Sequence, residues 1–465
     1  MKQANTISNT KAWKWVPSLY FAEGLPYVAV MSLSVIMYKN LGLNNTQVAF
    51  YTSWLYLPWT IKFLWSPFVD VLRSKRWWIV SMQILIGAAM AGIALTLPGP
   101  GWLQWSMVFF WLMAFSSATH DIAADGFYMH GLDGQQQQFF IGVRNTFYRV
   151  AMICGQGLLV MLAGRWEGWQ NNPLGIDSVP FAWMLCFLLM AVIFTLLALY
   201  HCFVLPRPES DATSQSKSAG DILKDLGNTF SSFIRKPHIV SAIAFMLLYR
   251  FAEAQLVKLS SPFLLDSVEA GGLGLSTSSV GFAYGTLGVV ALLAGGILGG
   301  IVISRRGLEK SILPMAWALC LPNLVYLFMA MTQIQNQACI YACIGLEQLG
   351  YGYGFTAYTA YLLHFCQGKH KTSHYAFCTA FMALGMMIPG MFAGKLQSLF
   401  DVWFEGLMSG YTAFFIWVMI SCIPCIWMSL VARKQLTKLI FKHYEDLEKL
   451  VRSMASDKRK HCFDG

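Results

Sequence analysis

The sequence predicts an all-α integral membrane protein with twelve transmembrane helices, arranged as two related six-helix halves. Composition, the spacing of apolar runs and an internal repeat all lead to this prediction. Of the 465 residues, 56% are hydrophobic and only 12% are charged, whereas about 25% are charged in a typical soluble domain. The mean hydropathy is +0.51. These values exclude a water-soluble globular protein.

Apolar runs of about 20 residues, separated by polar breaks, set the expected helices. The first run, Trp15 to Tyr38, is too long for a removable signal peptide and lacks a small-residue cleavage site. The twelve expected helices cover residues 13–39, 46–68, 77–98, 103–130, 139–163, 181–205, 238–266, 278–303, 311–331, 338–364, 374–399 and 410–432.

Composition also divides the chain into parts. Residues 206–237 are rich in Pro, Ser and charge, which is typical of a linker between an N-terminal half (1–205) and a C-terminal half (238–433). Residues 434–465 form a basic tail with apolar residues at helical spacing, expected to lie on the inner membrane surface. A coiled-coil contact is the alternative for this tail.

The distribution of Lys and Arg predicts the orientation. Loops on one side hold most of them, including Arg73, Arg207, Lys236 and Arg305, whereas the opposite loops are mainly acidic. By the positive-inside bias, both termini are expected in the cytoplasm. The net charge of +10 is therefore a topology signal, and no nucleic-acid partner is predicted.

An internal repeat supports two related halves. "LGLNNTQVAFYTS" (41–53) aligns with "LGLSTSSVGFAYGT" (273–286) at an offset near 232, which places Arg73 on Arg305. Halves with the same in–out sense are parallel repeats about an axis along the membrane normal. With twelve helices and a long central loop, this pattern points to the major facilitator superfamily, whose substrates bind near the midplane between the halves.

Charged residues inside the apolar runs are the candidate functional residues. Each would cost about 2.5–3.5 kcal/mol at a helix centre, so an idle role is not expected. Two copies of Phe-Ala-Glu contribute Glu23 and Glu253, and Glu23 has no basic neighbour on its own helix. The residues predicted to couple transport to protons are Asp121, Asp125, Arg149, Glu253 and Glu23.

Two pairings are expected between the fourth and fifth helices. Asp121 and Asp125 are four residues apart and share one helical face. An antiparallel hairpin would bring Arg149 toward Asp121 and Arg144 toward Asp125. These groups are either buried ion pairs that fix the helices or carboxylates that titrate during transport, and both alternatives stay open.

The seventh and tenth helices supply most of the predicted substrate-binding residues. Arg250 and Glu253 are spaced i, i+3 and either neutralise each other or serve as an anion anchor and a coupling site. The tyrosines could stack on sugar faces, although packing or interfacial roles are the more common explanation. The predicted substrate-binding residues are Arg250, Lys258, Glu347, Tyr27, Tyr249 and Gln348.

A loop between the second and third helices predicts a cytoplasmic gate. In "KFLWSPFVDVLRSKR" (62–76), Asp70 precedes Arg73, and this order resembles the acid-then-base loop of the superfamily that latches the cytoplasmic side. The equivalent loop of the second half repeats only the basic part, Arg305 and Arg306.

The motifs "FAEGLP", "IKFLWSPFVD", "SSATHDIAADGFY", "YRVAM" and "LLYRFAEA" resemble AmpG-type muropeptide permeases over essentially all twelve helices. The resemblance implies proton-driven import of N-acetylglucosaminyl-anhydromuramyl fragments across a bacterial inner membrane. It also implies that Asp121, Asp125, Arg149 and Glu253 match charged positions of that family. The chain departs from the family at Glu23, which replaces a small residue, in "LGMMIPG" of the eleventh helix, and in lacking extra helices that some members have.

Other functions are weighed against this one. Import of another oligosaccharide or a small anionic metabolite, a distant acetyl-CoA-transporter relationship, a non-transporting sensor and a membrane-embedded transferase are the alternatives. "DIAADG" lacks the following residues of metal-dependent phosphotransferases, so no catalytic residue, metal or cofactor is predicted. Cys422 and Cys425 form an isolated C-x-x-C without a partner pair, so a zinc or redox site is not predicted. A monomer is the usual expectation for this fold.

Overall fold

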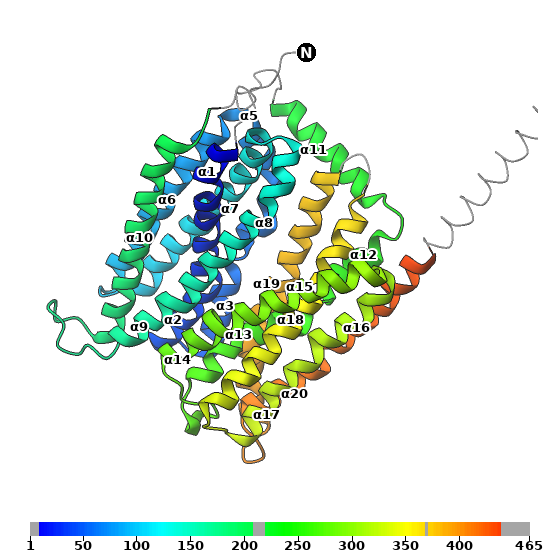
Figure 1. Ribbon diagram of the computed structural model, residues 1–465. Helices are drawn as coiled ribbons and strands as arrows, with labels where there is room; N and C mark the ends of the chain where they lie inside the picture. Colours follow the sequence, from blue (N-terminus) through cyan, green and yellow to red (C-terminus); the bar gives the residue numbers. More distant parts are fainter. Residues whose placement is uncertain (1–8, 208–218, 368–370, 439–465) are drawn as a thin grey trace, which may run out of the picture.

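The computed structural model describes residues 9–207, 219–367 and 371–438, and within these ranges it consists of helices joined by turns and loops, without β-strands. Figure 1 shows two helix bundles side by side, with α1–α10 toward the upper left and α12–α20 toward the lower right. We call the end of the molecule at which α1 begins the terminal end, and the opposite end the distal end.

The first bundle contains crossings 1 to 6, several of which consist of more than one helical segment. In chain order these are α1 (Asn9–Val28), η1 (Ala29–Leu33) and α2 (Ser34–Asn40); α3 (Asn45–Trp54), α4 (Leu57–Ile61), η2 (Lys62–Leu64) and α5 (Ser66–Leu72); α6 (Lys75–Thr96); α7 (Trp102–Gly131); α8 (Gly134–Met152), η3 (Ile153–Leu159) and α9 (Val160–Trp166); and α10 (Ser178–Val204).

The second bundle contains crossings 7 to 12. Helix α11 (Ala219–Ile234) precedes it. Then follow α12 (Ile239–Leu248) and α13 (Phe251–Leu265); η5 (Val268–Ala270), a short turn; α14 (Thr277–Gly281), η6 (Phe282–Gly288) and α15 (Val289–Arg306); α16 (Leu308–Cys320), η7 (Leu321–Asn323) and α17 (Leu324–Thr332); α18 (Gln337–Phe365); α19 (Lys371–Trp403); and α20 (Gly410–Ile420).

The twelve-helix prediction is confirmed. Ten helical spans in the described residues are long and apolar enough to cross a membrane. The remaining two crossings are α3–α5, which is interrupted, and α18, which is continuous over 29 residues but rich in polar side chains. Pro58 and Pro67 lie at the starts of α4 and α5, where a missing backbone N–H is tolerated.

The segment predicted as a linker contains a helix that the sequence analysis missed. Helix α11 lies within residues 206–237, and its Phe233 ring packs 5.9 Å from the Phe365 ring and 5.4 Å from the Phe377 ring. Its polar and charged composition concealed an apolar face that is buried on the second bundle. Of the predicted amphipathic tail, 434–465, the structure describes only residues up to 438, so that prediction lies almost wholly outside the described residues.

The two segments aligned by the repeat begin helices in the same way. Asn44 and Ser276, which are 232 residues apart, are the N-caps of α3 and α14, and each side chain accepts a hydrogen bond from a backbone N–H three residues later. The two bundles meet at the distal end. There, a Cβ added to Gly285 would lie 2.0 Å from the backbone nitrogen of Gly157, so only glycine permits this approach.

Candidate functional site

A cavity of about 160 Å³ lies between the two bundles. Residues from crossings 1, 2 and 5 line it on one side, and residues from crossings 7 to 11 line it on the other. Its charged and hydrogen-bonding lining residues include Tyr27, Gln156, Arg250, Glu253, Glu347 and Gln348. The structure therefore brings together four of the six predicted substrate-binding residues with Glu253, and it adds Gln156.

Arg250 and Glu253 form a two-point ion pair. The Arg250 Nε and Nη2 atoms lie 2.8 and 2.6 Å from the two carboxylate oxygens of Glu253, and Nη2 also donates to the Tyr351 hydroxyl at 2.9 Å. The helix breaks at Arg250, whose non-helical backbone separates α12 from α13. The predicted i, i+3 pairing is confirmed, and an anion could use Arg250 as its anchor only by competing with Glu253.

Lys258 and Tyr249 lie outside the cavity lining. The Lys258 ammonium donates to Thr52 Oγ1 at 3.0 Å and stands 4.9 Å from the centre of the Tyr56 ring, so it links α13 to crossing 2 of the other bundle. Lys258 has no carboxylate partner in the described ranges, although only 1% of it is exposed. Tyr249 donates to the Gly354 carbonyl at 2.9 Å and packs α12 against α18.

Glu347 is held by neutral groups. Its Oε2 accepts from Gln348 Nε2 at 2.8 Å and from the Tyr326 hydroxyl at 3.4 Å, and Tyr326 in turn contacts the Tyr284 hydroxyl. No ion pair of Glu347 occurs among the described residues. Glu347 therefore brings an acidic group to the cavity wall without a basic neighbour to neutralise it.

A second group of charges, which we call the carboxylate cluster, lies within the first bundle. Its acids are Glu23, Asp121 and Asp125, whose carboxylate oxygens lie within 4.8 Å of one another. Its bases are Lys62, which pairs with Asp121, and Arg144, which pairs with Asp125 at 2.8 Å. Such spacing could suit a metal ion, which the sequence did not predict, but ammonium and guanidinium groups already neutralise two of the acids.

One of the two predicted pairings is confirmed and the other is wrong. Arg144 pairs with Asp125 as expected, but Asp121 pairs with Lys62 and not with Arg149. Lys62 opens the 3-10 turn η2 and reaches Asp121 from crossing 2. The Arg149 guanidinium instead donates to the Met152 sulfur at 3.2 Å. Sequence spacing along one hairpin could not show that a third helix supplies the base.

Glu23 is the acid of the cluster without a base. It is 8% exposed, and its Oε2 is buried without a hydrogen-bond partner among the described residues. Asp125 has a second neighbour, because the Tyr20 hydroxyl donates to it at 3.4 Å. The Arg144 guanidinium also stands 4.5 Å from the centre of the Tyr20 ring.

A buried polar chain in the first bundle was missed from the sequence. Gln83 is hydrogen-bonded to His120 at 3.0 Å and to His201 at 2.9 Å, and His201 reaches Ser18 at 2.9 Å. These four side chains tie together α6, α7, α10 and α1. Gln83 and His120 are polar residues within apolar runs, and this pattern is visible in the sequence. The pattern does not show which of these side chains bond to one another.

Polar contacts close the distal end between the bundles; we call them the distal latch. Lys39 pairs with Asp266 at 2.7 Å. Asn40 donates to Glu167 Oε1 at 2.6 Å and to Thr277 Oγ1 at 2.8 Å, and Thr277 donates to Glu167 Oε2 at 2.6 Å. The latch joins crossings 1 and 5 of one bundle to crossings 7 and 8 of the other.

The predicted cytoplasmic gate cannot be described in full. The side chain of Asp70 lies outside the described residues, and Arg73 is exposed, with its guanidinium 5.9 Å from the centre of a Trp77 ring. The Asp70–Arg73 gate therefore stays a prediction.

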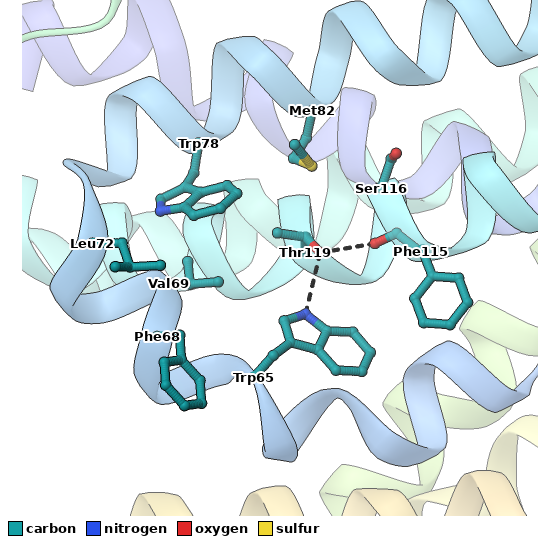
Figure 2. Close-up of a pocket in the computed structure, with 9 residues that line it drawn as sticks. All are labelled: Trp65, Phe68, Val69, Leu72, Trp78, Met82, Phe115, Ser116 and Thr119. Atoms are coloured by element: carbon teal, nitrogen blue, oxygen red, sulfur yellow. Dashed lines mark hydrogen bonds between the residues drawn. The ribbon is translucent and has the colours of Figure 1, made fainter. Parts of the chain in front are cut away.

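A further cavity of about 250 Å³ lies within the first bundle, between crossings 2, 3 and 4 (Figure 2). Its lining is mostly aromatic and aliphatic. The two hydrogen bonds drawn there run from Trp65 Nε1 to Thr119 Oγ1 at 3.2 Å and from Thr119 Oγ1 to the Phe115 carbonyl at 2.8 Å. None of the described lining residues is charged. The cavity between the bundles is therefore the better candidate for a polar ligand.

Comparison with known proteins assigns the chain to a protein family. Residues 18–394 match the family described as the Major Facilitator Superfamily. The chain belongs to this superfamily. Solved structures share this fold. A bacterial homologue of the human lysosomal transporter Spinster, in an inward-facing and unoccupied conformation, has a TM-score of 0.71 at 15% sequence identity, and the match covers 93% of this chain and 98% of that one. A mutant of the nucleoside transporter NupG has a TM-score of 0.68 at 13% identity, covering 91% and 99%.

Two curated superfamily relatives agree with the resemblance found in the motifs. The anhydromuropeptide permease of Escherichia coli K12 is 26% identical over 424 residues, which are 90% of this chain and 79% of that protein. The putative transporter AmpG 4 of Rickettsia felis is 23% identical over 431 residues, 90% of this chain and 95% of that protein. The chain is thus a multi-pass membrane transporter of the superfamily and not an enzyme, and it is similar to AmpG-type permeases over 90% of its length.

Proposed function

We propose that the protein is a proton-coupled importer of amino-sugar-containing cell-wall fragments, N-acetylglucosaminyl-anhydromuramyl muropeptides, working by alternating access. The observation that carries the proposal is the cavity between the bundles, with its ion pair, acid and aromatic groups. The name of the Escherichia coli relative supports the substrate class. At about 160 Å³ the cavity is smaller than the roughly 300–1,000 Å³ of typical ligand sites, so the bundles must separate to admit a disaccharide.

The proposal assigns roles to both charge groups. Arg250, Glu347, Tyr27 and Gln348 contact the substrate, with Lys258 and Tyr249 supporting the walls from behind. Asp121, Asp125, Arg149, Glu253 and Glu23 couple transport to protons, since intramembrane ionisable groups mark ion and proton pathways. With both termini on the cytoplasmic side of the inner membrane, the distal latch is the closed outer gate. A monomer suffices for this cycle.

Uptake into proteoliposomes tests the proposal. Labelled N-acetylglucosaminyl-anhydromuramic acid is supplied with and without an imposed proton gradient. We expect gradient-driven uptake that falls at least tenfold in Asp121→Asn and Glu253→Gln. Glu269→Gln, which changes an exposed acid in the distal turn η5, is the matched control and retains uptake. Uptake that ignores the gradient in folded, inserted protein would contradict the coupling.

A second candidate is import of another oligosaccharide or of a small anionic metabolite. Two cations favour an anionic substrate: Arg149 and Lys258 have no carboxylate partner among the described residues. A panel of unlabelled neutral glycans and small carboxylates, competing with the labelled disaccharide, separates the candidates. Stronger competition by a non-sugar anion would favour the second.

A further inference from the structure

We propose that the carboxylate cluster holds one exchangeable proton on Glu23 in this conformation, while Asp121 and Asp125 stay ionised in their pairs. The inference deepens the proposed function, on which it rests for its role in transport. Of the five residues assigned to proton coupling, it identifies Glu23 as the one that carries the proton.

The carboxylate cluster contains more acids than bases. The cluster has three acids, Glu23, Asp121 and Asp125, and two bases, Lys62 and Arg144. With all five ionised, one negative charge is left without compensation. An uncompensated charge is expensive in a low-dielectric interior, and a carboxyl group avoids that cost by taking up a proton.

The contacts place this proton on Glu23. Asp121 is the partner of Lys62, and Asp125 receives both Arg144 at 2.8 Å and the Tyr20 hydroxyl at 3.4 Å. Glu23, in contrast, is more than nine-tenths buried with an unpartnered Oε2 among the described residues. A protonated Glu23 becomes a donor, with acceptor oxygens of two carboxylates within 4.8 Å.

Charged and phenolic groups from four elements surround Glu23. They are Asp121 and Asp125 from α7, Arg144 and Tyr148 from α8, Lys62 from η2, and Tyr20 one turn earlier on α1. Both bases among them are already engaged by an acid. Ionisation of Glu23 would therefore require Lys62 or Arg144 to be shared between two carboxylates.

Release of the proton has a route and a consequence. The side chain of Asp125 is 40% exposed and that of Arg144 is 28% exposed, so water reaches the edge of the cluster. On release, the O–H bond of Glu23 breaks, the proton passes to water, and the electron pair stays on the carboxylate. The resulting excess negative charge draws Lys62 or Arg144 toward α1, which links protonation to how α1, α7 and α8 pack.

Infrared difference spectroscopy on purified full-length protein in nanodiscs tests the proposal without transport. In a Glu347→Gln background, which removes the buried acid of the second bundle that is held only by neutral groups, we expect a protonated-carboxyl C=O band that disappears on adding Glu23→Gln and remains, shifted, on adding Glu23→Asp. Glu253→Gln is the matched control, because it removes a buried acid that has its own arginine, and the band persists. Sodium chloride in place of potassium chloride leaves the band unchanged.

Two outcomes overturn the proposal. A band that survives the addition of Glu23→Gln in the Glu347→Gln background places the proton on another acid. A band weakened by sodium, together with a sodium-dependent rise in Tm that Glu23→Gln abolishes, makes the bound cation sodium. The proposed function fails separately: loss of the band in Glu23→Gln, with no uptake of any amino sugar, leaves the proton site standing and removes the substrate assignment.

Discussion

At the scale of single residues, the two Phe-Ala-Glu acids differ in how they are neutralised, because Glu253 has an arginine on its own crossing and Glu23 has no base of its own among the described residues. Arg250 and Glu253 meet within one turn of the same crossing, so their neutralisation is visible in the sequence. The acids of the carboxylate cluster obtain their bases from other crossings, Lys62 from crossing 2 and Arg144 from crossing 5. The two Phe-Ala-Glu copies thus place similar acids in different electrostatic settings.

Glu253→Gln should destabilise the protein because it leaves Arg250 buried without its counter-charge. Breaking a buried pair from one side costs about 3–5 kcal/mol, whereas removing both charges is often nearly neutral. We expect a clear fall in Tm for the single variant in detergent and recovery of most of it in Arg250→Gln/Glu253→Gln. A single variant as stable as the wild type would contradict the pairing. Gradient-driven uptake that returns in the double variant would make Glu253 structural only.

Arg149→Gln should separate binding from stability. The side-chain hydrogen bond of Arg149 goes to the Met152 sulfur, so its loss should leave Tm essentially unchanged. If Arg149 binds an anionic group of the substrate, removing a charged hydrogen bond worth about 1.5–3 kcal/mol should raise the KM for uptake about tenfold or more. Arg165→Gln, at an exposed arginine of the same crossing, is the control. An unchanged KM would remove Arg149 from the substrate site.

At the scale of elements, glycine decides how closely crossings 5 and 8 approach. A Cβ on Gly285 would lie 2.0 Å from the nitrogen of Gly157, and a Cβ on Gly164 would lie 2.4 Å from the nitrogen of Ser278. Both contacts lie at or toward the distal end. Backbones at this distance leave no space for a side chain, so the closed distal end depends on these glycines.

Gly285→Ala should therefore favour a conformation that is open at the distal end. A cysteine placed at Ser32, which lines the cavity, reports access by an impermeant thiol reagent from the distal side. We expect labelling about tenfold faster than in the parent, which corresponds to a shift of about 1.4 kcal/mol in the opening equilibrium. Gly300→Ala on the same crossing, where an added Cβ meets nothing within 4 Å, should label like the parent. Equal labelling in both would contradict the close-approach argument.

At the scale of the whole molecule, the distal latch holds the two bundles together, whereas the carboxylate cluster lies within the first bundle. Lys39 and Asp266 are 14% and 19% exposed, and Asp266 also accepts a hydrogen bond from Tyr411 at 2.6 Å. Asn45 joins the same network through Gln397 at 3.0 Å and Tyr411 at 2.7 Å. Residues from both bundles therefore belong to one hydrogen-bond network at the distal end.

Lys39→Asp should open the distal end, and the exchange Lys39→Asp/Asp266→Lys should close it again. The pair is partly exposed, so its loss is worth about 1 kcal/mol, or about fivefold in the opening equilibrium. The Ser32 cysteine reporter measures this change from the distal side, with Lys11→Asp at the terminal end as the control. Failure of the exchanged pair to restore slow labelling would show that the latch does not depend on this ion pair.

The sequence by itself determined the membrane fold, the twelve crossings, the repeat, the Arg250–Glu253 pair and the presence of acids in the apolar runs. Those features depend on local composition and on spacing along one helix. Only the tertiary structure decided that Lys62 neutralises Asp121, that Arg149 lacks an acid among the described residues, that the Tyr249 hydroxyl bonds the Gly354 carbonyl and that α11 packs against α19. Each of these depends on which helices become neighbours and on how close their backbones come, and residues from separate crossings carry no mutual spacing in the sequence.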